Sequence, residues 1–229
     1  MLNQDLLDCL SQWDTPTICN ALELVVPERR GHGFSVHPFS VMYPEAKPMV
    51  GYARTAKIRA SHPVNSNAEC VDRLDYYEYI ASGASPTIVV IEDVDPQPGV
   101  GAYWGEVHTA VHKALGALGV ITNGSYRDIA DNAPGFQILG GMVGPSHAYV
   151  HPISVNTNVT VHGMAVSHDD LIHADRHGAV VVPSAVAEKI PEAVAQIADR
   201  EAKVLSVARS DNFSMDKLKQ ALGGTSEAH

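Results

Sequence analysis

Apolar residues follow two different spacings along the chain, and the spacing changes several times. A short β-branched run, Thr-Ile-Val-Val-Ile at 87–91, predicts a buried strand, and further strands are predicted over 50–60 and 119–122. Residues 105–119 instead carry apolar side chains at helical spacing, which predicts an amphipathic helix that ends at Gly119. The apolar stripe of this helix would consist of Val107, Ala110, Val111, Ala114, Leu115 and Leu118.

Helices are also predicted outside this central part of the chain. Three leucines within residues 6–10 lie at helical spacing, and Asp14 followed by Thr-Pro is typical of the cap and first turn of a second short helix. A helix is expected over about 68–81, and an alanine-rich helix over 184–209 precedes a short terminal helix. Residues 26–48 are rich in proline and glycine and are expected to form an extended connector.

The later part of the chain is rich in predicted strands. They lie at 137–143, 157–166, 170–175 and 179–182. Elements that alternate in the middle of the chain, followed by strands that crowd together, favour a mixed sheet over a purely parallel one. We therefore expect one α/β domain over residues 1–229, with helices in 1–25 and 184–229 packing on it.

Composition and charge exclude several classes of protein. The 229 residues carry 16 Lys+Arg and 26 Asp+Glu, a formal net charge of −10, and 18% of them are charged while 45% are hydrophobic. This balance argues against a disordered chain and, because phosphate binding needs clustered Lys and Arg, against a nucleic-acid partner. No run of about 18 apolar residues occurs, so we expect no membrane partner. The low charge fraction predicts either a large core or surface buried in subunit contacts.

The first residues and the cysteines bear on the compartment. Residues 1–5 contain neither a basic stretch nor an apolar segment, so we expect no secretory signal there. Cys9, Cys19 and Cys70 are odd in number and lack zinc-binding spacing, which favours buried or half-buried thiols in a reducing environment. We therefore expect a cytoplasmic protein.

Two segments, 104–108 and 124–131, carry side chains suited to chemistry. The first opens the predicted helix, where free backbone N–H groups and the helix dipole favour an anion. The second follows a predicted buried strand and contains Arg127, Asp128 and Asp131. An arginine beside two carboxylates offers a fork for a substrate carboxylate and oxygens for a hard cation. Taken alone, Arg127 and Asp128 also suit a surface ion pair.

The order of these motifs resembles that of the RraA-like family, which includes the divalent-metal-dependent 4-hydroxy-4-methyl-2-oxoglutarate (HMG/CHA) aldolases. The matching motifs are Gly105-Glu106, Gly119-Val120-Ile121-Thr122-Asn123-Gly124, Arg127-Asp128 and Asp131. Segments 15–22, 51–55 and 170–183 are similar to the family's N-terminal helix, first strand and late hairpin, so the resemblance covers about 15–183. It implies a single-domain α-β-β-α sandwich with a mixed sheet, of the swivelling β/β/α type.

The resemblance implies a class II pyruvate aldolase. Such a lyase cleaves a 4-hydroxy-2-oxo acid, for example 4-hydroxy-4-methyl-2-oxoglutarate, to pyruvate, and the same site suits oxaloacetate decarboxylation because both reactions leave a pyruvate enolate. The implied cofactor is Mg²⁺ or Mn²⁺, with Asp128 as the direct metal ligand. Mg²⁺ needs few protein ligands because it keeps several waters. Arg127, Glu106 and Asp131 are the implied catalytic residues, the last two holding coordinated waters.

The implied partner is a small anionic oxo acid. Arg127 would pair with its carboxylate and with the developing enolate oxygen, a contact that strengthens toward the transition state. The backbone N–H groups of Val107 and His108, beside Gly105, would hold the carboxylate at the start of the helix. His147, in a predicted loop near the site, is a further candidate for substrate binding. By the same resemblance, the active sites lie at the subunit boundaries of a homotrimer or homohexamer.

Other chemistries stay open on the residues alone. A Schiff-base aldolase needs a buried lysine, and of the lysines only Lys57 lies in a predicted buried strand. His108 and His112 have an i,i+4 spacing that can bind zinc or copper, although half-exposed helix residues are the simpler interpretation. The family also contains a protein that binds and restrains a ribonuclease. A non-catalytic regulator of that kind is therefore the alternative function.

Overall fold

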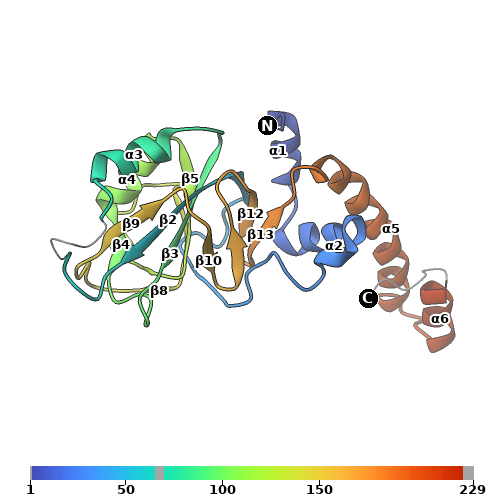
Figure 1. The fold of residues 1–229 in the computed structure, drawn as a ribbon. Helices are drawn as coiled ribbons and strands as arrows, with labels where there is room; N and C mark the ends of the chain where they lie inside the picture. Colours follow the sequence, from blue (N-terminus) through green and yellow to red (C-terminus); the bar gives the residue numbers. More distant parts are fainter. Residues whose placement is uncertain (1, 65–69, 224–229) are drawn as a thin grey trace.

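The computed structural model of the chain describes residues 2–64 and 70–223. Within these residues, the architecture is mixed α/β, with a large curled mixed sheet, two smaller sheets, and helices on the large sheet (Figure 1). No helix in the two described ranges is long and apolar enough to cross a membrane.

The centre of the large sheet is parallel. It consists of β2 (Met49–Arg59), β3 (Thr87–Asp93), β5 (Ala117–Thr122) and β7 (Gln137–Gly140), in the order β7-β5-β3-β2. The sequence predicted β2, β3 and β5 correctly, because each is a run of apolar or β-branched residues. Parallel strands end at the same edge of a sheet, so the segments that follow β3 and β5 leave the sheet side by side.

Antiparallel strands flank this centre. They are β1 (Ser40–Val41) beside β7, β9 (His151–Val155) and β12 (Leu171–Asp175) beside β2, and β13 (Gly178–Val182) beside β12. The predicted mixed sheet is therefore confirmed. β9 was not predicted, because it is half-buried throughout and shows no alternation of apolar and polar residues that would indicate a strand.

Two small sheets complete the strands. β10 (Val159–Val161) and β11 (Met164–Val166) form a hairpin whose valines pack with Ile88 and Val90 on one face of the large sheet. The other small sheet is parallel and contains β4 (Ala102–Trp104), β6 (Ser125–Tyr126) and β8 (Met142–Val143). Because β6 follows β5 after a two-residue turn, this small sheet extends the carboxyl edge of the large one.

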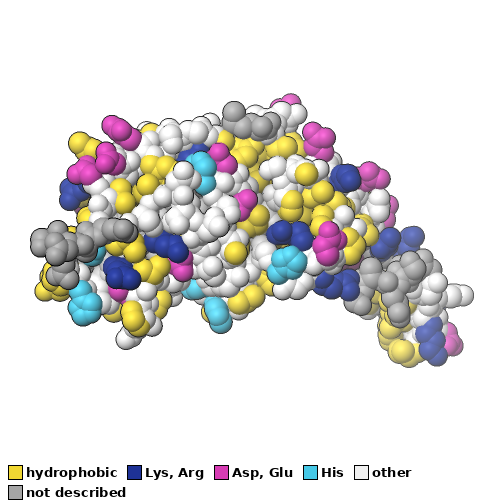
Figure 2. All heavy atoms as spheres, viewed as in Figure 1, with side chains coloured by type: hydrophobic (Ala, Val, Ile, Leu, Met, Phe, Trp, Pro, Cys, Tyr) yellow, Lys and Arg dark blue, Asp and Glu magenta, His cyan; other side chains and the backbone are white. Residues whose placement is uncertain are grey.

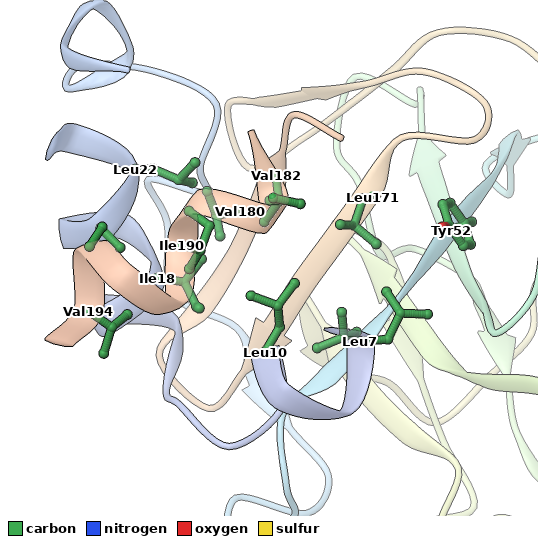
Figure 3. Packing of buried hydrophobic residues seen from close by; sticks show 14 of the residues in the cluster. Leu7, Leu10, Ile18, Leu22, Tyr52, Leu171, Val180, Val182, Ile190 and Val194 are labelled. Atoms are coloured by element: carbon green, nitrogen blue, oxygen red, sulfur yellow. The ribbon is translucent and has the colours of Figure 1, made fainter. Parts of the chain in front are cut away.

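Helices cover the opposite face of the large sheet at its β12–β13 end (Figures 1 and 3). They are α1 (Gln4–Leu10), α2 (Thr15–Val25) and α5 (Ile190–Ala208). Leu10, Ile18 and Ile190 are completely buried there, in a cluster that also contains Val180 and Val182 of β13. The predicted cap is confirmed, since the Asp14 side chain accepts the N–H of Thr17 at the start of α2.

Two further helices, α3 (Arg73–Ala81) and α4 (Glu106–Ala114), cover the same face at the other end of the sheet (Figure 1). Successive side chains along β2 point to opposite faces of the sheet, and this alternation determines which layer each of them packs against. Tyr52 belongs to the α1–α2–α5 cluster, Ile58 belongs to the α3 cluster, and Ala53 points to the hairpin face. The sequence correctly predicted a helix that ends at Ala81, although α3 begins later than expected, and residues 65–69 lie outside the described residues.

The helix predicted over 105–119 is shorter than expected. α4 ends at Ala114, and Gly116 follows in the left-handed region with φ +90°. A left-handed glycine is a common helix end, so the C-terminal glycine signal was correct in kind but belongs to Gly116 rather than Gly119. Residues from Ala117 onward already form β5.

The apolar stripe predicted for this helix faces the wrong way. The buried side chains of α4 are Thr109 and His112, whereas Val107 is 69% exposed. The inward face is polar because Thr109 hydrogen-bonds to Asn132 and His112 hydrogen-bonds to Tyr76. Polar partners inside the fold, rather than hydrophobicity, therefore set the orientation of α4.

The C-terminal part of the described chain projects from the body. The first turns of α5 pack on the sheet through Ile190, Ala193 and Val194, and the rest of α5 extends away from it with α6 (Met215–Gly223) (Figures 1 and 2). Short 3₁₀ helices lie at Pro27–Arg29, within the predicted connector, and at Ala187–Lys189, before α5. Hydrophobic side chains are spread among polar ones over the face shown in Figure 2.

Candidate functional site

Two paired strands bring the sequence motifs together. Trp104 at the end of β4 pairs with Tyr126 at the end of β6, and the N–H of Arg127 donates to the Trp104 carbonyl oxygen at 2.8 Å. Gly105 and Arg127 directly follow these paired residues. The segment that opens α4 and the Arg-Asp segment therefore meet at the edge of the small parallel sheet.

Arg127 and Asp128 lie in a tight turn. Asp128 has φ +53°, in the left-handed region that aspartate adopts more readily than most residues. The N–H groups of Asp131 and Asn132 donate to the Asp128 carbonyl oxygen at 2.9 and 3.0 Å. The turn directs the Asp128 side chain toward the start of α4.

The Asp128 carboxylate lies at the N-terminus of α4. Its Oδ2 accepts the backbone N–H of Glu106 at 3.2 Å, and the Nε of Arg127 is 3.4 Å from the same oxygen. The N-cap residue Gly105 supplies no side-chain cap, and a Cβ at its position would clash with Asp128 Oδ2. Glycine at this position therefore keeps open the space that the carboxylate uses.

The charged groups of the site are open to solvent. The side chains of Arg127 and Asp128 are 37% and 34% exposed, and Glu106 and Asp131 are exposed. A ligand from solution can therefore reach all four. A guanidinium, a helix N-terminus and the Asp128 carboxylate in one place suit an anion bound together with a hard cation.

His108 contributes its backbone to the site rather than a charge. Its N–H and that of Val107 lie in the first turn of α4 and have no acceptor within the helix. The His108 ring packs against Tyr103 with 4.2 Å between ring centroids. Burial lowers the pKa of His108 to about 4, so the ring is neutral at pH 7 and adds no positive charge to that of Arg127.

His112 is fully buried, which corrects the expectation of a half-exposed residue. Its Nδ1 donates to the His108 carbonyl oxygen at 2.6 Å, so its Nε2 accepts the Tyr76 hydroxyl at 2.8 Å. Burial lowers the pKa of His112 to about 3. Both ring nitrogens of His112 take part in hydrogen bonds, so the i,i+4 pair of His108 and His112 does not form a zinc or copper site.

His147 lies apart from the other candidates. It is exposed, its ring is 2.6 Å from the Ala148 carbonyl oxygen, and its own carbonyl lies against Gly101 before β4. Among residues 2–64 and 70–223, no hydrogen bond, ion pair or ring contact joins His147 to Arg127 or Asp128. Its role in substrate binding stays a prediction.

Sequence reasoning missed two residues behind the site, Thr109 and Asn132. Both are buried, and Asn132 Nδ2 donates to the carbonyl oxygens of Arg127 and Asp128. Thr109 Oγ1 lies 3.2 Å from Asn132 Oδ1. Neither residue is charged, and no motif spacing marks either of them, so the sequence carries no signal that distinguishes them from other polar residues.

The donor set fits one class of metal better than another. The described residues contain no group of three or more His, Cys, Asp and Glu side chains placed to hold a metal ion, so they form no zinc-type cluster. Mg²⁺ is bound through one or two carboxylates and keeps several waters. Asp128 offers one carboxylate at the start of α4, and the Glu106 and Asp131 side chains are exposed to water. These residues therefore fit Mg²⁺ or Mn²⁺.

The lysine route to an aldolase lacks a suitable amine. Lys57 lies on β2, as predicted, but it is only half-buried, and its Nζ is 3.4 Å from a carboxylate oxygen of Glu92. The Lys57 amine is therefore paired with Glu92, whereas a Schiff base requires a lysine amine that contacts the substrate. Lys57 is also absent from the contacts that join Gly105, Arg127 and Asp128.

The fold and the joined motifs define a mixed α/β protein of the aldolase/RraA class. The family model for RraA-like proteins, described as Aldolase/RraA, matches residues 15–181. The chain belongs to the RraA-like family. No curated protein matches it.

Solved structures share this fold. An uncharacterized protein from Pseudomonas syringae pv. tomato str. DC3000 has a TM-score of 0.73 and 21% identity, covering 98% of this chain and 95% of its own. RraAS2 from Streptomyces coelicolor, described as an unusual member of the RNase ES inhibitor RraA protein family, has a TM-score of 0.68 and 21% identity, covering 88% and 96%. The RNA-processing inhibitor RraA from Thermus thermophilis has a TM-score of 0.51 and 18% identity, covering 71% and 90%. At these identities the likeness shows the fold alone.

Proposed function

We propose that this chain is a divalent-metal-dependent lyase that cleaves a 4-hydroxy-2-oxo acid, such as 4-hydroxy-4-methyl-2-oxoglutarate, to pyruvate, and that also decarboxylates oxaloacetate. The observation that carries the proposal is the placement of the Arg127 guanidinium and the Asp128 carboxylate at the N-terminus of α4. Both reactions leave pyruvate as its enolate. The site must therefore stabilise negative charge on the C2 oxygen beside a carboxylate.

The substrate carboxylate would bind between Arg127 and the first turn of α4. The guanidinium can donate two parallel hydrogen bonds, and the free N–H groups of Val107 and His108 point along the helix axis toward the same region. Contact between Arg127 and the C2 oxygen strengthens as charge develops there. A contact that is stronger in the transition state than in the bound substrate raises turnover rather than affinity alone.

The proposed cofactor is Mg²⁺ or Mn²⁺, held directly by Asp128. When bound, it would supply Lewis-acid stabilisation of the charge on the C2 oxygen. Glu106 and Asp131 would accept hydrogen bonds from water beside Asp128. Such a water would take the proton of the substrate's C4 hydroxyl group as the C3–C4 bond breaks, and that proton would return to C3 of the enolate to give pyruvate.

The charges of the site predict an order of binding. The two segments of the site carry three carboxylates, those of Glu106, Asp128 and Asp131, and one guanidinium, and the whole chain carries a formal net charge of −10. An anionic substrate is repelled by this field unless positive charge is added locally. Substrate binding is therefore expected to require the divalent metal first.

We also propose a homotrimer or homohexamer whose subunit boundary lies beside this site. The apolar side chains of Val107 and Ile129 are 69% and 56% exposed next to the charged residues. A neighbouring subunit that covered them would exclude water from the site. A mass measurement in solution is expected to give three or six chains, and a stable monomer would contradict this part of the proposal.

The alternative is a non-catalytic regulator that binds a ribonuclease. Exposed Val107 and Ile129 also favour this function, because apolar side chains rimmed by charged ones are typical of protein-binding surfaces. A regulator, however, needs no free helix N-terminus and no carboxylate held against it. The geometry around Asp128 therefore favours the lyase.

A pyruvate-release assay tests the two functions. The purified chain is given 4-hydroxy-4-methyl-2-oxoglutarate or oxaloacetate, with Mg²⁺, with Mn²⁺, or with EDTA. We expect pyruvate with either metal and none with EDTA. Absence of metal-dependent release from both substrates and from related hydroxy-oxo acids contradicts the lyase, and co-elution of such an inactive chain with a ribonuclease supports the regulator.

A further inference from the structure

We propose that Asn132 is a positioning residue of the candidate site, and that with Thr109 it fixes Arg127 and Asp128 against the first turn of α4. Its expected effect on turnover rests on the proposed function, whereas its expected effect on the turn does not. Neither side chain reaches the substrate region directly, since both are buried behind the Arg-Asp segment.

The Asn132 carboxamide bridges two successive carbonyl groups. Its Nδ2 is 2.7 Å from the Arg127 carbonyl oxygen and 2.9 Å from the Asp128 carbonyl oxygen, so each of its two N–H groups donates to one of them. The side chain is 3% exposed, so bulk water does not compete for these bonds. The bonds fix the directions of the peptide groups that carry both charged residues.

The backbone of Asp128 makes this support necessary. Its φ of +53° lies in the left-handed region, which is unfavourable for a residue with a side chain unless surrounding contacts fix it. The Asp128 carbonyl oxygen accepts N–H groups from the backbone of Asp131, the backbone of Asn132 and the side chain of Asn132. Without the carboxamide the turn is free to relax, and the Asp128 carboxylate is free to leave the N–H of Glu106.

Thr109 links the turn to α4. Its Oγ1 accepts the N–H of Ala133 at 3.0 Å, and it lies 3.2 Å from Asn132 Oδ1 and 3.0 Å from the Gly105 carbonyl oxygen. The hydroxyl has one proton and donates to one of these acceptors at a time. Through this hydroxyl the 127–133 turn and the first turn of α4 are held in one position relative to each other.

Gln137 on β7 offers a matched control for Asn132. It is also a buried carboxamide, and its Oε1 accepts the N–H of Tyr43 at 3.0 Å while its Nε2 donates to the Tyr43 carbonyl oxygen at 2.7 Å. Tyr43 belongs to the connector before β2, not to the turn or to α4. Gln137→Ala therefore removes a comparable buried carboxamide without changing the support of Arg127 and Asp128.

The test compares Asn132→Ala, Asn132→Asp and Gln137→Ala with the wild-type chain. Hydrogen exchange is measured on the peptide that covers 127–133, and kcat and KM are measured for Mg²⁺-dependent pyruvate release. Asn132→Asp keeps the size of the side chain but replaces both donated bonds with repulsion between oxygens, so it serves if Asn132→Ala does not fold. We expect both Asn132 variants to exchange faster in 127–133 and to lose about 10²-fold in kcat, with a smaller change in KM.

Thr109 supplies a rescue arm. Thr109→Ser keeps the hydroxyl and is expected to keep wild-type exchange in 127–133 and kcat within about threefold, whereas Thr109→Val keeps the shape without the hydroxyl and is expected to lose about tenfold. Both kcat values are expressed per folded molecule, because a loss of folded protein lowers the apparent kcat without changing KM.

Two results overturn the proposal. One is exchange in 127–133 that is no faster in the Asn132 variants than in Gln137→Ala, whatever the activity of the chain. The other is a kcat of the Asn132 variants equal to that of Gln137→Ala when the wild-type chain is active. If the wild-type chain releases no pyruvate, the proposed function fails, and the exchange comparison alone decides whether Asn132 holds the turn.

Discussion

The N-termini of α2 and α4 each receive a carboxylate from a distant part of the chain, and they differ in what remains free. At α2, Asp175 Oδ2 accepts the N–H of Thr15 at 2.9 Å, and Asp14 caps the N–H of Thr17 at 2.9 Å. Burial alone would raise the pKa of Asp175, but N–H groups of Thr15 and His177 hold it below its ordinary value. Thr15 is buried, and the N–H groups of Thr15 and Thr17 both have acceptors, so these contacts stabilise the start of the helix.

At α4 the same type of contact is left incomplete. Asp128 Oδ2 accepts the N–H of Glu106, and the N-cap residue Gly105 has no side chain that could cap the helix. The Asp128 side chain is also partly exposed. The following N–H groups have no acceptor in the helix. The two helix ends therefore share one kind of aspartate contact but differ in exposure and in capping. These differences are the reason that we propose ligand binding at α4 and not at α2.

The largest expected effect separates the two aspartates directly. Asp128→Asn keeps the shape of the side chain but removes the charge that would hold the metal, so pyruvate release is expected to fall about 10³-fold while urea unfolding stays near that of the wild type. Asp175→Asn is expected to lower the free energy of unfolding by about 2 kcal/mol and to leave turnover per folded molecule unchanged. Equal turnover in the two variants would contradict the assignment of different uses.

The next effect comes from filling the space at the start of α4. A Cβ at Gly105 clashes with Asp128 Oδ2, so Gly105→Ala is expected to displace the carboxylate and lower kcat about 10²-fold. Gly31 is the control, because a Cβ there meets nothing within 4 Å. Similar kcat values for Gly105→Ala and Gly31→Ala would show that the open N-cap has no function.

Acid is expected to destabilise the α4 end of the fold through His112. The folded pKa of about 3 lies below the ordinary value of 6.5, so the unfolded chain binds more protons as the pH falls through 6.5, and the free energy of unfolding decreases. His112 alone contributes a loss of about 2 kcal/mol between pH 7 and pH 5. His112→Gln is expected to flatten this dependence in urea unfolding, and exposed His147→Gln is not. Parallel pH curves for His112→Gln and the wild type would contradict the buried neutral histidine.

The smallest effect concerns the cap of α2. Asp14→Ala removes the acceptor of the Thr17 N–H and is expected to cost about 1 kcal/mol in the free energy of unfolding. Pyruvate release per folded molecule is expected to stay at the wild-type level, because α2 lies at the other end of the sheet from Arg127. A loss of turnover beyond the unfolded fraction would show that the two helix ends are coupled.

The elements that sequence reasoning predicted well are those whose periodicity reports burial directly. β2 and β3 are apolar and buried, and α2 has both a cap and a proline signal. The orientation predicted for α4 was wrong because the buried face of this helix is polar. Residues from other parts of the chain hydrogen-bond to that face, and the spacing of hydrophobic residues does not indicate such partners. β9 was missed because it is half-buried along its whole length.

The candidate site likewise contains some residues that the sequence predicted and others that it did not. Gly105, Arg127 and Asp128 were selected through a resemblance of motifs, and strand pairing between Trp104 and Tyr126 brings them together. Asn132 was not selected, because a neutral amide that acts through backbone carbonyls leaves no pattern along the chain. A side chain that acts by hydrogen-bonding to backbone carbonyl groups can be identified only from the structure of the turn that it supports.

We propose that the open end of α4 binds a divalent metal through Asp128 and an oxo acid through Arg127. The decisive measurement is the anomalous diffraction of crystals grown with Mn²⁺ and pyruvate, recorded near the manganese absorption edge. We expect one anomalous peak beside Asp128, with the pyruvate carboxylate between Arg127 and the first turn of α4. Mn²⁺ bound away from Asp128, or pyruvate bound away from Arg127, would contradict it.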